Sequence, residues 1–312
     1  MGERGGLEYL LAGDASALDC SSVSAWWAHQ AARCAQYAST IETAVAGGFA
    51  ADRLAWAFCA GYQAALRALV PVLPADALAS FCVSEAAGNH PRAIQSRIRP
   101  DPDRAGQFIL DGHKRWTSLG PDSSLLLVAA RVEGMAPSER IPLKLAMVRS
   151  AAPGVTLRPM SEIDFIPEVA HAEVQFERVS IAARDLLEGD GYARYVKPFR
   201  TLEDLHVHAA VLAYLLREAR RLQWPRTWME RALANLYALC AIAPQDPLSP
   251  AMHIALAGAL AAGAALIDES GSLWETAAGD AASKRWQRDR ALLSVAHAAR
   301  EQRLARAWET IG

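Results

Sequence analysis

The feature that most constrains the fold of this 312-residue chain is a double change in its hydrophobic pattern. From about Ser22 to Leu73, apolar residues recur with a helical period. From about Phe81 to Ile181, short β-type runs replace them, and after Asp190 the helical period returns. This order predicts an α+β protein. We predict an N-terminal helical domain over 1–78, a central antiparallel β domain over 79–185 and a C-terminal helical bundle over 186–312.

The N-terminal region is expected to hold two helices. Gly47-Gly48 is predicted to separate them, Asp52 is a start signal for the second, and Pro71 and Pro74 end it. The C-terminal region shows further helical segments. They are Val211–Leu222, Trp228–Ala241, Ala251–Ile267 and a long final segment, Ala281–Trp308.

The central region contains six β-type runs bounded by Gly, Pro and Asp. Ala172–Phe176 alternates with period two, as a half-buried strand does. A compact antiparallel β domain is therefore predicted. The six runs are Gln107–Leu110, Lys114–Ser118, Leu125–Arg131, Leu143–Val148, Gly154–Arg158 and Ala172–Phe176.

Charge and composition argue against several partners. With 32 basic and 34 acidic residues, the chain lacks the excess of positive charge that is typical of nucleic-acid-binding proteins. The most apolar stretch, Ala251–Ile267, falls short of the ~20 apolar residues that cross a bilayer, and the N-terminus lacks the pattern of a secretory signal. The five cysteines are widely spaced and His206 and His208 face different sides of a helix, so no metal site is predicted. We expect a cytoplasmic protein with neither nucleic-acid nor membrane partners.

Two segments about thirty residues apart carry the most specific pattern. The first, FCVSEAAGNH, spans Phe81–His90, and the second, LDGHKRWTSLG, spans Leu110–Gly120. Together they resemble the acyl-CoA dehydrogenase family, and the likeness is strongest from Phe81 to about Leu215. Further family-like segments follow in order: Ala152–Thr156, Glu173–Val179, Asp185–Gly191, Arg200–Glu203 and Arg285–Asp289.

The resemblance implies a function as well as a fold. It implies an FAD-dependent oxidoreductase that carries out αβ-dehydrogenation of an acyl-CoA or other acyl thioester, with the flavin carrying the redox step. It also implies a homodimer or homotetramer. The electron acceptor and the acyl chain stay unspecified.

The resemblance assigns cofactor contacts to six residues. Trp116 matches the tryptophan that packs against the flavin ring, and Ser118 matches a hydroxyl that hydrogen-bonds near N5. Val83 and Ser84 match a pair at the pyrimidine edge. The predicted cofactor-binding set is Phe81, Val83, Ser84, Trp116, Thr117 and Ser118.

Four substitutions in the family pattern mark the predicted substrate site. Asn89 stands where the family has a serine and His90 where it has an aspartate. Glu203 replaces an aspartate and His206 an arginine. An imidazole does not replace the planar fork of a guanidinium, so the carrier need not be CoA.

The catalytic base is also changed. Many family members have a glutamate eight residues after the aspartate of the Arg-Asp motif, and the same count from Asp289 reaches His297. Histidine can act as a general base near neutral pH. Glu301, one helical turn on, is expected to orient His297 or to replace it. Glu203 is a third candidate base, from another helix.

These departures from the family's sequence pattern suggest two alternative functions. Family segments that supply adenine and pyrophosphate contacts near the C-terminus are not found here, which favours a scaffold without redox activity that serves as a binding or assembly partner. A flavin monooxygenase on the same fold is the other alternative.

Overall fold

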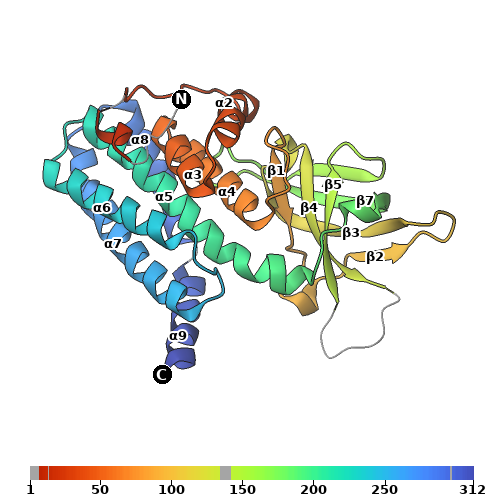
Figure 1. Cartoon of the computed structure of the whole chain (residues 1–312). Coiled ribbons are helices and arrows are strands. Elements are labelled where there is room, and N and C mark those ends of the chain that lie inside the picture. Colours follow the sequence, from red (N-terminus) through yellow and green to blue (C-terminus); the bar gives the residue numbers. More distant parts are fainter. Residues whose placement is uncertain (1–6, 13, 134–141, 296) are drawn as a thin grey trace. The chain divides into compact units, whose positions relative to one another are not determined.

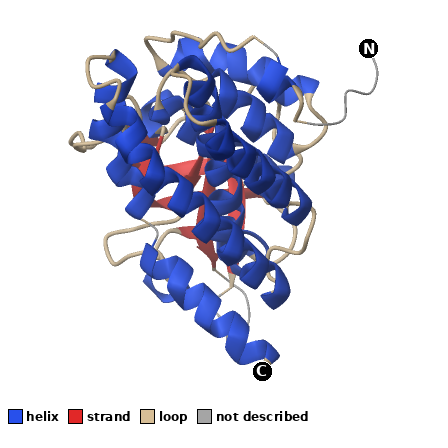
Figure 2. Ribbon diagram, turned by 90° about the vertical axis from the view of Figure 1, so that its left-hand side faces the viewer, coloured by secondary structure: helices blue, strands red, loops and turns tan. Residues whose placement is uncertain are grey.

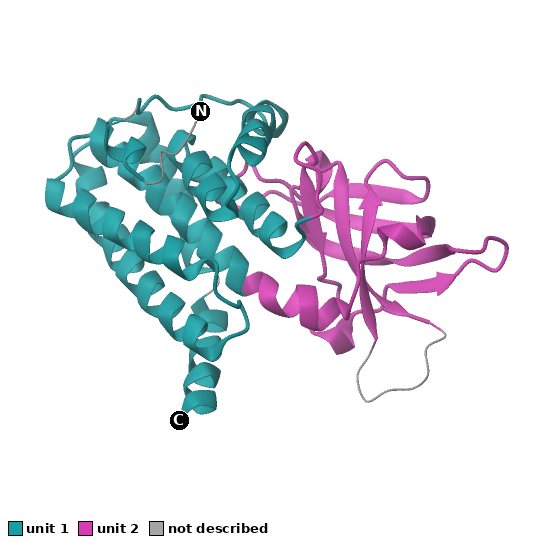
Figure 3. Ribbon diagram, viewed as in Figure 1, with its two compact units in different colours: residues 1–71, 164–166, 201–312 teal, residues 72–163, 167–200 magenta. Residues whose placement is uncertain are grey.

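The computed structural model describes residues 7–12, 14–133, 142–295 and 297–312. The chain separates into two compact units (Figure 3). Unit 1 comprises residues 1–71, 164–166 and 201–312, and unit 2 comprises residues 72–163 and 167–200. The helices predicted at the two ends of the chain thus fall within one unit. The boundary at Arg200 lies inside helix α5.

Unit 2 is built on a seven-stranded sheet (Figure 1). The path of hydrogen-bonded neighbours is β1-β4-β2-β3-β7-β6, and β5 pairs with β4. The core of unit 2 is apolar and includes Ile98, Leu126 and Phe176, each almost fully buried. The strands are β1 (Ala79–Cys82), β2 (Arg97–Pro100), β3 (Gln107–Ser118), β4 (Leu125–Val132), β5 (Leu143–Arg149), β6 (Val155–Pro159) and β7 (His171–Ala182).

The predicted antiparallel character of this domain needs a correction, because the sheet is mixed. β1 and β2 each run parallel to β4, whereas the other pairs are antiparallel. Hydrophobic alternation reports which face of a strand is buried and not which strand lies beside it. Two predicted runs, Gln107–Leu110 and Lys114–Ser118, form the single strand β3, whose register against β7 shifts twice.

Unit 1 is helical (helices in blue, Figure 2). Within it α3 packs closely on α4, and α7 lies against both α6 and α9. A short π-helical turn, Tyr192–Val196, leads into α5. The helices are α1 (Tyr9–Ala12), α2 (Val23–Gln36), α3 (Thr40–Ala50), α4 (Leu54–Leu69), α5 (Lys197–Arg221), α6 (Arg226–Ile242), α7 (Pro250–Glu275), α8 (Ala281–Asp289) and α9 (His297–Ile311).

Gly47-Gly48 does not separate two helices, because both residues lie inside α3. A Cβ atom on Gly48 would overlap the backbone carbonyl of Ala210 on α5. These glycines therefore permit close helix contact and do not form a break. The break comes instead at Ala51–Arg53, where Asp52 forms an ion pair with Arg53 at 2.7 Å.

The predicted final helix is interrupted. α8 ends at Asp289, and a 3₁₀ segment, Arg290–Ser294, follows before α9. The Asp289 carboxylate is fully buried, pairs with Arg288 at 2.6 Å and accepts a hydrogen bond from the Ile166 backbone N–H at 2.8 Å. The Arg-Asp pair of the sequence motif thus holds a distant backbone segment.

Helix α7 is long and apolar enough to cross a membrane by length and composition alone, with a mean hydropathy of 1.7 in its most apolar window. It extends well beyond the predicted Ala251–Ile267. One third of that window, 33%, is buried within the protein, and the buried residues of the helix include Leu256, Leu266 and Trp274.

Candidate functional site

The two family-like segments lie side by side in unit 2. The Ser80 hydroxyl donates to the Ser118 carbonyl at 2.7 Å, and the Arg115 backbone N–H donates to the Ser84 carbonyl at 2.8 Å. These bonds join the end of β1 to the end of β3. Predicted cofactor residues about thirty positions apart in the sequence are thereby brought close together, although β1 and β3 are not paired in the sheet.

A buried ionic network fixes this arrangement. The Lys114 ammonium donates to the Glu85 carboxylate at 2.7 Å and to the Val83 carbonyl at 3.2 Å. Glu85 also accepts hydrogen bonds from the backbone N–H of Gln95 and from the N–H and hydroxyl of Ser96. Burial would raise the pKa of Glu85, but Lys114 and Ser96 hold that pKa below its ordinary value. Burial lowers the pKa of Lys114.

Trp116 presents an apolar plane to solvent. Its side chain is 53% exposed, and its φ of +58° lies in the left-handed region that tryptophan seldom adopts. The cause is local: the β3–β7 register shifts between Lys114 and Thr117, and a bulge redirects a side chain. The Trp116 ring meets the His171 ring edge-on, with centroids 6.0 Å apart.

Ser118, two residues after Trp116, has a partner that the sequence analysis did not identify. Ser118 and His171 are paired across β3 and β7, and the Ser118 Oγ lies 3.2 Å from the His171 Nε2. Burial lowers the pKa of His171. The sequence gives no signal for this pair, because it depends on the register between two strands about fifty residues apart.

The other predicted cofactor residues differ in accessibility. Thr117 is fully buried, and its hydroxyl donates to the Cys82 Sγ at 3.7 Å, so its side chain belongs to the core. The Phe81 ring packs on Phe199, with centroids 4.4 Å apart. Val83 is 7% exposed, whereas Ser84 is half-buried. Trp116, Ser118 and Ser84 are therefore the polar or planar groups with accessible side chains.

The predicted substrate residues Asn89 and His90 lie in the exposed loop after β1. The His90 Nδ1 accepts a hydrogen bond from the Arg92 backbone N–H at 3.2 Å and caps the short helix Pro91–Ala93. His90 thus has a local structural role, while Asn89 is exposed.

In unit 1, the two predicted residues of α5 have different surroundings. His206 is 1% exposed, its Nδ1 lies 2.7 Å from the Leu202 carbonyl, and its Nε2 lies 3.0 Å from the Thr40 hydroxyl. Burial lowers the pKa of His206 to about 4, so the ring is neutral. Both ring nitrogens have protein partners, and we do not carry His206 into the proposed site. Glu203 is half-buried.

The predicted base pair lies on the surface of α9. The His297 Nδ1 is 3.6 Å from a Glu301 carboxylate oxygen, so the expected one-turn spacing brings them together. Their side chains are 74% and 69% exposed. On the same helix, Arg300 and Arg303 bind the buried Asp204 of α5. Within the described part of the chain, no cluster of three His, Cys, Asp or Glu residues could hold a metal.

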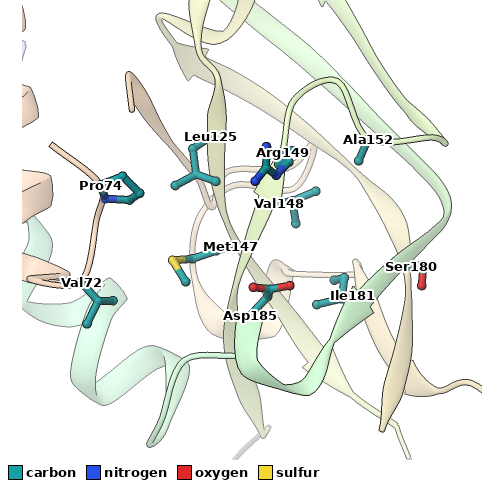
Figure 4. A pocket seen from close by; sticks show the side chains of 10 residues that line it. All are labelled: Val72, Pro74, Leu125, Met147, Val148, Arg149, Ala152, Ser180, Ile181 and Asp185. Carbon is teal, nitrogen blue, oxygen red and sulfur yellow. The ribbon is translucent and has the colours of Figure 1, made fainter. Parts of the chain in front are cut away.

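A separate cavity of about 310 Å³ opens in unit 2 (Figure 4). An apolar wall that includes Met147 and Val148 lies between Arg149 and Asp185. Of the residues described here, none that was predicted for the site lines it. The lining is Val72, Pro74, Leu125, Met147, Val148, Arg149, Ala152, Ser180, Ile181 and Asp185.

Comparisons with known proteins align with the region that holds the two family-like segments. The family model described as acyl-CoA dehydrogenase, middle domain, matches residues 80–179, which include both segments of the site. A probable acyl-CoA dehydrogenase of Arabidopsis thaliana, IBR3, is 28% identical over 130 residues. That alignment covers 39% of this chain and 15% of the plant protein, so the chain spans a small part of that relative.

Solved structures share the fold over nearly the whole chain. Butyryl-CoA dehydrogenase from Megasphaera elsdenii has a TM-score of 0.71 at 13% identity, covering 92% of this chain and 90% of that one. A glutaryl-CoA dehydrogenase from Mycobacterium smegmatis, in complex with FADH2, has a TM-score of 0.62 at 12% identity, covering 91% and 88%. The predicted α+β fold class is confirmed. Residues 80–179 thus resemble the middle domain of acyl-CoA dehydrogenases, and the chain as a whole has the fold of solved members of that family.

Proposed function

We propose that this protein binds FAD against Trp116 and acts as an oxidoreductase on an acyl thioester, by αβ-dehydrogenation. The observation that carries the proposal is the Trp116 side chain, 53% exposed at a φ of +58°. A bulky residue in this backbone region costs of order 1–3 kcal/mol and persists where the surrounding structure enforces it. A flat ligand stacked on the indole would use the plane that this conformation exposes.

The groups around Trp116 suit a flavin ring. A flavin needs an apolar plane for its ring system and hydrogen-bonding groups at its polar edge. Trp116 offers the plane, and the accessible Ser118 and Ser84 offer hydroxyls that can both donate and accept. Thr117 does not fit this role, because its hydroxyl is buried against Cys82. The Lys114–Glu85 ion pair links β3 to the segment that follows β1.

The reaction requires a base for the proton next to the thioester carbonyl. A flavin held against Trp116 would supply the acceptor for the hydride of the β-carbon. His297, Glu301 and Glu203 are our candidates for the base, and CoA or another thiol carries the acyl group. The solved relative with bound FADH2 supports a flavin cofactor for this fold.

The first experiment is a visible spectrum of the purified protein after incubation with FAD. We expect bound flavin in the wild type and an FAD Kd about twofold to twelvefold higher in Trp116→Ala, since aromatic stacking contributes about 0.5–1.5 kcal/mol. Trp308→Ala is the matched control, because Trp308 is equally exposed at 56% but lies on α9. Equal affinities in all three proteins would place flavin elsewhere, and no binding in any would overturn the proposal.

A second experiment identifies the base. Glu203→Gln, Glu301→Gln and His297→Gln are assayed separately with acyl-CoA and an artificial electron acceptor. Loss of a general base lowers kcat about 100-fold or more, with the FAD content unchanged. If no variant shows this loss, the base is none of the three.

One observation favours the alternative of a scaffold without redox activity. Two of the three candidate bases, His297 and Glu301, are about 70% exposed. A general base whose pKa is tuned for catalysis is usually at least partly shielded from water. A protein that takes up no FAD would support this alternative.

A further inference from the structure

The cavity of about 310 Å³ in unit 2 has the size of a small-molecule site. Ligand pockets in proteins generally measure about 300–1,000 Å³. Every residue that lines this cavity belongs to unit 2, and none of them is Ser84, Trp116 or Ser118, the residues of the proposed flavin site. The cavity is therefore a second candidate binding site on this chain.

Much of the cavity wall is apolar. Val148 and Ile181 are each 3% exposed and also belong to the core of unit 2. Met147 and Leu125 are half-buried, and Val72 is 68% exposed. An apolar chain in the cavity would cover these partly exposed side chains, which removes apolar surface from water. The wall thus favours an apolar body in the ligand.

Two opposite charges flank this wall (Figure 4). The Arg149 side chain lies on one side of Met147 and Val148, and the Asp185 carboxylate lies on the other. Among the residues that the structure describes, neither charged side chain has an ion-pair or hydrogen-bond partner. Apolar walls around a cavity focus the field of such charges, so each attracts a ligand group of opposite charge.

Backbone contacts with β5 set the positions of both charged residues. Arg149 is the last residue of β5 and is paired with Leu125 of β4. Asp185 ends a short 3₁₀ helix, and two residues later the Leu187 backbone N–H donates to the Leu145 carbonyl on β5 at 2.8 Å. A ligand therefore meets charges whose backbone is already ordered, which lowers the entropic cost of binding.

We propose that this cavity binds a linear zwitterion, a molecule with a carboxylate at one end, an ammonium at the other and an aliphatic chain between them. The carboxylate pairs with Arg149, whose planar guanidinium matches it in geometry. The ammonium pairs with Asp185, and the methylene chain packs on Met147 and Val148. The inference goes beyond the proposed function and requires no bound flavin.

The first test is an NMR titration of the purified protein with 6-aminohexanoate, followed by backbone amide chemical shifts. We expect saturable shifts that include the amides of Met147, Arg149 and Asp185. Hexanoate and hexylamine each keep one of the two charges, and each should bind about twofold to fivefold more weakly, as expected for the loss of a solvent-accessible ion pair. The isomer 2-aminohexanoate carries both charges at the same end of the chain, and its Kd should be higher by a similar factor.

Two variants separate the ends of the site. Arg149→Gln should raise the Kd of 6-aminohexanoate and of hexanoate about twofold to fivefold and leave that of hexylamine unchanged. Asp185→Asn should raise the Kd of 6-aminohexanoate and of hexylamine and leave that of hexanoate unchanged. Arg184→Gln is the matched control, because Arg184 is exposed and lies next to Asp185 in the chain but does not line the cavity. It should change none of these affinities.

Several results would overturn the inference. They are the absence of saturable shifts at millimolar 6-aminohexanoate, shifts confined to residues outside the cavity, and equal affinity for 2-aminohexanoate. A loss in Arg184→Gln as large as in Arg149→Gln would also overturn it, because net charge and not the cavity would then explain binding. Absence of FAD binding would overturn the proposed function and leave this inference standing.

Discussion

Two pairs of acid and base side chains lie in opposite environments. In unit 2, Lys114 and Glu85 are 2.7 Å apart and almost fully buried. In unit 1, His297 and Glu301 are 3.6 Å apart, and each is about 70% exposed. The family resemblance pointed to both regions, but only the first has the shielding and the additional hydrogen bonds that fix a geometry.

The two pairs also differ in how many parts of the chain they connect. Glu85 accepts bonds from Lys114, Ser96 and Gln95, and the network joins the loop after β1 to β3 and β2. His297 contacts Glu301 on its own helix. A buried pair depends strongly on both partners, whereas an exposed pair contributes little.

The largest effect is expected from breaking the buried pair. Lys114→Met leaves the Glu85 carboxylate buried without its cation, and we expect the free energy of unfolding to fall by about 3–5 kcal/mol. Urea unfolding followed by tryptophan fluorescence measures this. Arg97→Met is the control, since Arg97 pairs with Glu133 at the surface and should matter by less than about 1 kcal/mol. A loss below about 1 kcal/mol in Lys114→Met would contradict the comparison.

A smaller loss is expected from the packing of unit 1. Gly48→Ala places a Cβ against the Ala210 carbonyl, and such overpacking costs about 1–3 kcal/mol. Gly258→Ala on α7 meets no atom within 4 Å, and removing a helical glycine should stabilise by up to about 1 kcal/mol. Thermal unfolding of both variants measures the contrast. Similar shifts in both would show that α3 and α5 are not closely packed.

The acid dependence of stability tests Glu85 directly. Its pKa in the folded protein lies below the ordinary 4.5, so between these values the unfolded chain binds a proton that the folded chain does not. Stability is therefore fully present above pH 4.5 and falls as the pH drops through the folded-state pKa, by up to about 1.4 kcal/mol per pH unit. Urea midpoints against pH should decline less steeply in Glu85→Gln. Parallel curves would show that the carboxylate has no depressed pKa.

The smallest effect is expected on the surface of α9. His297→Ala and Glu301→Ala should each change the free energy of unfolding by less than about 0.5 kcal/mol, because both side chains are exposed. Arg303→Ala on the same helix removes a partner of the buried Asp204 and should cost about 1–3 kcal/mol. A loss of that size in His297→Ala would show that the pair is shielded in the native protein.

Much of the fold was predictable because the hydrophobic period is a local property. The order of helices, strands and helices follows from it, and the six predicted runs all lie within observed strands or overlap them. The parallel pairing of β1 and β2 with β4 could not be predicted, since strand partners depend on long-range contacts. Gly47-Gly48 was misread as a break because its close contact with α5 comes from a distant part of the chain.

The candidate site stays a prediction. The sequence motifs predicted Trp116 and Ser118 as cofactor contacts, but the burial of Thr117 and His206 emerged only from the packing. His171 was missed, because its place opposite Ser118 is set by strand register.

The sequence by itself determined the order of the elements, the family-like segments and the residue types available for chemistry, since these are properties of neighbouring residues. The tertiary structure decided which of those residues are shielded, which hydroxyls are already hydrogen-bonded and which side chains face solvent. Burial and hydrogen bonding depend on residues far apart in the chain. For this reason Trp116 emerges as an exposed plane, Lys114 as a buried cation and His297 as a surface residue.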